Sequence, residues 1–238
     1  MPMRRLVRLT LLVLATASTL IGVGAGGGAP AGAAGEPIQP GVEIRTADGG
    51  CTLNFIYDGT GGLAGKVYGG TAAHCVSAVG QPVMLGTGET FGTVALIGDE
   101  NSTVADYAFI EVFPALHSRV VAAMKGHPSY PRGVTTAAET NVGDLVQLSG
   151  YGLGFGLTQP TQERRVAVVT YDDAEEHEVV APLIFGDSGG PLVHIPTGKA
   201  YGIVSRLCIG VCEEEGPTVE GLLAKAAARG FTVRLRTV

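Results

Sequence analysis

One stretch, residues 185–191, constrains the chain more than any other part of it. Its order Phe-Gly-Asp-Ser-Gly-Gly-Pro places Ser188 between glycines and directly after Asp187. Glycine adopts backbone conformations that a Cβ forbids and lets a ligand approach the main chain closely. A serine in such a turn can expose its hydroxyl while nearby N–H groups point into the same space, as acyl transfer requires. The simpler alternative is a glycine-rich hairpin with an incidental serine, and further motifs decide between the two.

The pattern of short apolar runs favours an all-β protein. Runs of Val, Ile, Leu, Thr and Tyr are bounded by Gly, Pro and Asp, and helical periodicity is scarce before the C-terminus. Near the end, residues 219–229 have apolar side chains at helical spacing, with Gly230 as the stop signal. We expect a short helix there, followed by a final strand over 231–235.

Residues 1–34 have the order of a secretory signal peptide. Arg4, Arg5 and Arg8 precede an apolar run over 9–23, and small residues follow. A membrane-spanning helix is the alternative, but the apolar run is short and contains several Thr, Ser and Gly residues. We predict cleavage after Ala33 or Ala34, with 35–40 as a linker or propeptide remnant. The mature protein is therefore expected to be extracellular, without stable membrane association.

Charge and length narrow the function classes. Loss of the three leader arginines leaves 13 basic and 22 acidic side chains, a formal charge of −9. An acidic chain argues against nucleic acid or anionic lipid as the partner. About 204 residues remain, which is enough for one domain or two small barrels that share a core.

Four cysteines follow the leader: Cys51, Cys75, Cys208 and Cys212. An even count in a secreted chain favours disulfides, and four cysteines allow three pairings. A zinc site would need all four to converge, and no C-x-x-C unit is present. No metal site is therefore expected.

Two further motifs carry candidate catalytic residues. Residues 71–75, Thr-Ala-Ala-His-Cys, place His74 between small residues and a cysteine, which can hold the ring rigidly. Asp106 directly precedes an apolar strand over 107–112; a strand-capping aspartate is the alternative interpretation. Asp99 and Glu100 lie nearby, in a turn over 98–102 that we expect to be solvated.

In chain order these motifs give His, Asp and Ser, and together they resemble the chymotrypsin/trypsin-like serine proteases, particularly the secreted bacterial branch. The resemblance covers about residues 41–216. It implies two six-stranded antiparallel β-barrels with a cleft between them. The first barrel would span 41–114, a connection 115–132, and the second barrel 133–238 with the C-terminal helix and strand.

The resemblance also implies residue roles. Ser188 would be the nucleophile, His74 the general base and Asp106 its orienting partner. The N–H groups of Gly186 and Ser188 would form the oxyanion hole. The main chain of Ser205, Arg206 and Leu207 would pair with an extended substrate. The implied function is a secreted serine endopeptidase that acts as a monomer on proteins or peptides without a cofactor.

Departures from the family pattern matter as well. No cysteine precedes the serine motif in 182–185, which suggests Cys208–Cys212 as one disulfide and Cys51–Cys75 as the other. No Ile-Val-Gly-Gly segment is present to supply a new amino terminus for Asp187, and bacterial relatives use an internal arginine there. Three arginines remain open as that partner: Arg132, Arg164 and Arg165.

The residue at position 182 indicates which side chain the substrate pocket prefers. Trypsin-like relatives carry an aspartate six positions before the nucleophile, and Pro182 stands there instead. We therefore expect cleavage after apolar residues, with Leu207 narrowing the pocket. The acidic loop Glu213–Glu215 or Arg206 would overturn this expectation by attracting basic or acidic side chains, respectively.

Two alternatives to a protease of this family remain to be weighed. A binding protein on an inactive protease scaffold would share the fold without the activity. The G-x-S-x-G motif of another hydrolase fold needs a helix after Ser188 and a later acid and histidine, in that order. Here residues 191–193 predict a strand, and His194 is the only histidine downstream.

His117, His127 and His177 are predicted to be surface residues without a role. His177 is expected in a solvated acidic loop over 172–178.

Overall fold

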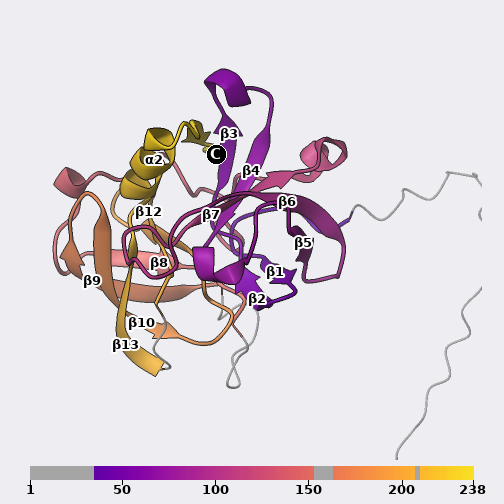
Figure 1. Cartoon of the computed structure of the whole chain (residues 1–238). Helices are drawn as coiled ribbons and strands as arrows, with labels where there is room; N and C mark the ends of the chain where they lie inside the picture. The colour runs from indigo at the N-terminus through magenta and orange to yellow at the C-terminus, as the bar shows by residue number, and fades with distance from the viewer. Residues whose placement is uncertain (1–34, 153–162, 207–209) are drawn as a thin grey trace, which may run out of the picture. The chain divides into compact units, whose positions relative to one another are not determined.

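Two antiparallel β-sheets form the protein (Figure 1). The computed structural model describes the backbone of residues 35–152, 163–206 and 210–238. In these residues no helix is long and apolar enough to cross a membrane. The all-β fold class predicted from the sequence is confirmed.

The first sheet has eight strands in the order β14-β3-β4-β7-β6-β5-β1-β2, whereas six were expected. One of the two additional strands is the C-terminal strand β14, which joins the sheet at the β3 edge. The strands of this sheet are β1 (Glu43–Thr46), β2 (Gly49–Thr52), β3 (Ile56–Gly59), β4 (Val67–Thr71), β5 (Pro82–Leu85), β6 (Thr90–Ile97), β7 (Ala108–Val112) and β14 (Val233–Leu235).

The second sheet has six strands, as expected, in the order β12-β11-β8-β9-β10-β13. They are β8 (Leu145–Leu148), β9 (Arg165–Asp172), β10 (Glu176–Leu183), β11 (Pro191–His194), β12 (Lys199–Ile203) and β13 (Gly210–Pro217). Alternate residues of β10 are buried, which is the period of a strand with one face on a core. Because Ser188 is followed by strand β11, the hydrolase fold that needs a helix after the serine is excluded.

Three apolar clusters form the core. One cluster consists of buried side chains on and around the strands of the first sheet, and another of buried side chains on and around the strands of the second sheet. A third joins both halves: it brings Tyr57 and Phe109 of the first sheet together with Ile203 of the second and Leu222 of the helix α2 (Val219–Ala228). The site described below therefore lies between two sheets that share buried apolar surface.

The C-terminal segment contains the expected helix and strand. The Thr218 side chain caps α2 by accepting from the Gly221 N–H, and Gly230 follows the helix with a φ of +79°. The expected place of the last strand in the second barrel is wrong: β14 pairs with β3 of the first sheet. The physical reason is the Phe231 ring, which packs against Tyr68 at 4.9 Å and Phe109 at 5.1 Å.

Candidate active site

His74 and Asp106 come together between the two sheets. His74 lies in a 3-10 turn (Ala73–Cys75) directly after β4, and Asp106 lies just before β7, which pairs with β4. The His74 Nδ1 atom is 2.8 Å from Asp106 Oδ2, and the His74 backbone N–H donates to Oδ1 at 3.1 Å. Asp106 is buried while His74 is partly exposed. This geometry orients the imidazole with its other nitrogen, Nε2, free of the carboxylate.

Hydrogen bonds keep Asp106 ionised in spite of its burial. Burial alone would raise the pKa of this carboxyl group, but hydrogen bonds from His74 and Ser205 and the charge of His74 outweigh it. The net effect holds the pKa of Asp106 below its usual range. Asp106 is therefore a charged acceptor for the imidazole at neutral pH.

A disulfide fixes the turn that carries His74. Cys51 of β2 and Cys75 are bonded, as predicted, with their Cα atoms 6.2 Å apart. One ligand atom from each of Cys51, His74 and Cys75 lies within 4.8 Å of the others. The two sulfurs are bonded to each other and so are not thiolates, which removes the zinc alternative that required all four cysteines.

Ser188 lies in the turn between β10 and β11. Gly186 and Gly189 on either side have φ values of +98° and +81°, which favour glycine. A Cβ on Gly189 would lie 2.2 Å from Thr71 Oγ1, so this position also lacks room for a side chain. The Ser188 carbonyl accepts from the Thr52 N–H at 2.8 Å, which fixes the turn to β2 of the first sheet.

Two amide groups of the turn make no hydrogen bond within the described part of the protein. Within the described residues, the N–H groups of Gly186 and Ser188 donate to no protein acceptor. In the same part of the chain, Ser188 Oγ makes no hydrogen bond to the His74 ring. Such contacts are often long without substrate and shorten when it binds.

Arg165 is the partner of Asp187. Its guanidinium donates to both carboxylate oxygens, at 2.5 and 2.6 Å, and to the Pro182 carbonyl at 2.9 Å. The Ile184 N–H and the Gly152 N–H also donate to Asp187, each at 3.0 Å. Of the three arginines left open by the sequence, the structure selects Arg165, and this buried pair fixes the residue next to Ser188.

Ser205, predicted to contact substrate, is buried and bonds to Asp106 Oδ2 through its hydroxyl at 2.5 Å. Its N–H donates to Glu214 Oε1 at 2.6 Å, and Glu214 Oε2 lies 3.2 Å from His177 Nε2. The prediction of His177 as a surface residue in a solvated loop is wrong, since it lies in β10 and is fully buried. The expectation that Glu213–Glu215 form a loop is also wrong, since these residues lie in strand β13 and Glu214 is fully buried.

The other predicted substrate residues are only partly placed. Pro182 lies on β10 with its carbonyl bonded to Arg165. Arg206 is exposed, its N–H donates to the Glu215 carbonyl, and its guanidinium bonds to the Asn101 carbonyl at 2.9 Å. Leu207, Cys208 and the side chain of Cys212 lie outside the described residues, so the second disulfide remains a prediction.

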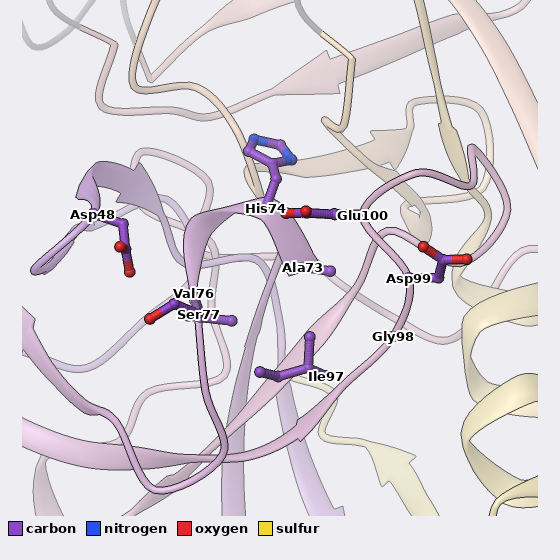
Figure 2. A pocket seen from close by; sticks show the side chains of 9 residues that line it. All are labelled: Asp48, Ala73, His74, Val76, Ser77, Ile97, Gly98, Asp99 and Glu100. Atoms are coloured by element: carbon purple, nitrogen blue, oxygen red, sulfur yellow. The ribbon is translucent and has the colours of Figure 1, made fainter.

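Two cavities flank the site. One of about 430 Å³ lies beside His74, which stands between Asp48 on one side and Glu100 and Asp99 on the other (Figure 2). The expectation that Asp99 and Glu100 are solvated is met, because both are exposed. The second cavity, of about 410 Å³, includes Gly186 and the side chains of Tyr151 and Phe185 in its lining. One cavity thus lies against the candidate base, and the other lies against the first residue of the serine turn.

Comparisons with known proteins agree with this architecture. The trypsin family model matches residues 27–220. No curated protein sequence matches the chain. Protease A of Thermobifida fusca is similar in structure, with 18% identity and a TM-score of 0.60 over 84% of this chain and 99% of that one.

Two further solved structures support the same fold. The chymotrypsin of Cellulomonas bogoriensis is 20% identical with a TM-score of 0.58, covering 84% of this chain and 99% of its own. A glutamic-acid-specific serine protease is 20% identical with a TM-score of 0.61, covering 84% and 100%. At these identities the structural likeness shows the fold alone, whereas the family model covers most of the sequence. The chain therefore belongs to the trypsin family of serine proteases.

Proposed function

We propose that the protein is a serine endopeptidase in which Ser188, His74 and Asp106 form the catalytic triad. The observation that carries this proposal is the His74–Asp106 pair, in which Asp106 is buried and its pKa is held below its usual range, next to a glycine-bounded serine turn. Nucleophile, base and orienting acid are the three parts that acyl transfer by a serine needs.

The first half-reaction forms an acyl-enzyme. Ser188 Oγ attacks the scissile carbonyl while His74 Nε2 takes the hydroxyl proton. The oxyanion of the tetrahedral intermediate accepts hydrogen bonds from the N–H groups of Gly186 and Ser188, and the loss of one such donor costs about 3 kcal/mol. His74 then protonates the leaving amine as the C–N bond breaks. Asp106 stabilises the imidazolium that exists between these two proton transfers.

The second half-reaction returns the enzyme to its starting state. Water attacks the acyl carbonyl, His74 accepts a water proton, and the Ser188 oxygen leaves and regains its proton from His74. The atoms and protons of the two half-reactions balance without a metal ion or a redox partner.

Covalent labelling of Ser188 tests the proposal against the inactive binding protein that would share this scaffold. A fluorophosphonate should label the wild type at Ser188, and the label should be absent from Ser188→Ala and strongly reduced in His74→Ala. Because triad members act as a unit, His74→Ala should lose peptidase activity to about the same extent as Ser188→Ala. A folded Ser188→Ala variant with near-wild-type peptidase rates would overturn the assignment.

We further propose cleavage after apolar residues. Pro182 supplies no carboxylate, and Glu214 is fully buried and already bonded to Ser205 and His177. A buried Lys or Arg side chain without a partner would bear a desolvation cost of several kcal/mol. Cleavage of a mixed peptide library checks this: cuts after Lys or Arg would implicate Glu213–Glu215, and cuts after Glu or Asp would implicate Arg206.

Export is part of the same proposal. The Cys51–Cys75 disulfide is typical of an oxidising compartment, and the order of residues 1–34 is typical of a signal peptide. Mass spectrometry of the protein from the culture medium should find an amino terminus at Ala34 or Gly35, or further along if a propeptide is removed. Accumulation of the full-length chain inside cells would contradict export.

A further inference from the structure

We propose that Glu214 and His177 form a buried pair that positions Ser205 and, through the Ser205 hydroxyl, the Asp106–His74 pair. This inference rests on the proposed peptidase function. Both residues lie in the second sheet, Glu214 on β13 and His177 on the neighbouring β10, and both are fully buried.

The Glu214 carboxylate is bonded at both oxygens. Oε1 accepts from the Ser205 N–H at 2.6 Å, and Oε2 lies 3.2 Å from His177 Nε2. A buried carboxylate is costly unless hydrogen bonds compensate it, so it persists where neighbouring donors are held for it. The acid therefore holds the Ser205 main chain by a charge-assisted bond, which is stronger than a bond between neutral groups.

His177 holds the other side of the carboxylate. Among the described residues its Nδ1 atom has no hydrogen-bond partner, so the tautomer with the proton on Nε2 leaves a bare lone pair and no unpaired N–H. The ring lies against Tyr201, with the centroids 5.1 Å apart. A Cβ on Gly202 would lie 2.4 Å from its Cε1 atom, so the glycine keeps the space that the imidazole occupies.

Ser205 connects this pair to the triad. Its N–H is held by Glu214, and its hydroxyl donates to Asp106 Oδ2, the same oxygen that accepts from His74 Nδ1. A shift of the Ser205 main chain would move the hydroxyl away from Asp106 and loosen the carboxylate that orients the imidazole. Glu214 and His177 are thus positioning residues, because they act through Ser205 and do not touch the reacting atoms.

A double-mutant cycle separates positioning from a general contribution to stability. Glu214→Ala, Ser205→Ala and the double variant are compared for kcat and KM on one peptide. We expect each single variant to lower kcat about tenfold, Ser205→Ala to keep KM within about twofold, and the double variant to match the kcat of Ser205→Ala alone. If the two substitutions acted independently, kcat of the double variant would instead fall by the product of the two single factors. Glu178→Ala, next to His177 on β10 but on the opposite face of the strand, is the matched control and should keep the wild-type kcat.

Glu214→Gln keeps an oxygen for the Ser205 N–H and gives a second test where Glu214→Ala does not fold. We expect it to hold kcat within about threefold of wild type. A folded Glu214→Gln variant as slow as Ser205→Ala would overturn the proposal, as would Glu214→Ala at the wild-type kcat or a double variant at the product of the two single losses.

An NMR readout distinguishes failure of this inference from failure of the proposed function. The resonance of the His74 Nδ1–H proton reports its bond to Asp106 without turnover. We expect it to move in Glu214→Ala and Ser205→Ala by similar amounts and to stay in place in Glu178→Ala. An unmoved resonance in Glu214→Ala overturns the inference. Absence of peptidase activity and of fluorophosphonate labelling in the wild type overturns the proposed function but leaves the NMR test intact.

Discussion

The buried carboxylate of Asp187 lies next to Ser188, and the Arg165 guanidinium balances its charge. Both side chains are almost fully buried, so neither charge is solvated by water. Such a pair contributes little net stability compared with apolar residues of the same size, but removal of one partner leaves a buried charge. At the residue scale, the oxyanion turn therefore depends on a pair outside the triad.

Arg165→Met should destabilise the protein by about 3–5 kcal/mol and reduce labelling of Ser188. The reason is the uncompensated Asp187 carboxylate, which the remaining N–H donors of Ile184 and Gly152 cannot neutralise. Urea unfolding and fluorophosphonate labelling measure the two effects. Lys66→Met breaks the more exposed pair with Glu111 and should cost less than about 1 kcal/mol. Equal losses in both variants would contradict the argument.

Stability should fall in acid partly through Asp106. In the folded protein the pKa of the Asp106 carboxyl group is held below its ordinary value of 3.8. The ionised group therefore contributes its full share to the free energy of unfolding above pH 3.8, and this contribution is lost as the pH falls through the lower, folded-state pKa. Urea unfolding of wild type and Asp106→Asn should show a stability difference at pH 7 that shrinks below about pH 4. A difference that stays constant from pH 7 to pH 2 would show that ionised Asp106 contributes nothing.

At the scale of elements, the loop between Cys51 and Cys75 determines where His74 lies. The disulfide joins β2 to the His74 turn across a sequence separation of 24 residues. The Cys51→Ser/Cys75→Ser variant should lose about 3 kcal/mol of stability in the chain-entropy model, and its peptidase activity should fall because the His74 turn is freed. Thermal unfolding with and without reductant checks the effect on stability. The Tm of the wild type should fall towards that of the variant when the disulfide is reduced, and the Tm of the variant should not change.

The sequence predicts the turns well where glycines and small residues define them. It predicts poorly which face of a strand is buried where apolar residues occupy both faces. The glycines and small residues around Ser188 and His74 allow few backbone conformations, so those motifs located the turns. In β9 the exposed residues Val166 and Val168 are as apolar as the buried Ala167 and Val169, so alternation could not show that Arg165 points inward.

In strand β10 the sequence pattern itself indicates that His177 is buried. His177 is in phase with Val179, Ala181 and Leu183, all of which are buried, and this period of two placed the imidazole on the core face. The acidic neighbours Glu176 and Glu178 suggested a solvated loop instead. Glu214 offered no comparable signal, because it stands between two other glutamates and is buried through long-range contacts with Ser205 and His177.

For the molecule as a whole, the C-terminal segment joins both halves. α2 contributes Leu222 and Ala226 to the cluster shared by the two sheets, and β14 then adds a strand to the first sheet. The pairing of β14 could not be predicted from its own residues, because a three-residue strand fits either sheet edge. Its partner is determined by where α2 ends and by the contacts of Phe231.

Because the cluster is shared, the two sheets should unfold together. Leu222→Ala removes a fully buried side chain from it and should cost about 2–5 kcal/mol. The loss should appear equally in native-state hydrogen exchange of slow amides in β4 of the first sheet and β9 of the second, since both would exchange through one cooperative opening. Val142→Ala, at an exposed position, is the control and should leave both rates unchanged. If only β9 lost protection, or if calorimetry of the wild type showed two transitions, the halves would be independent domains and the shared cluster a minor contact.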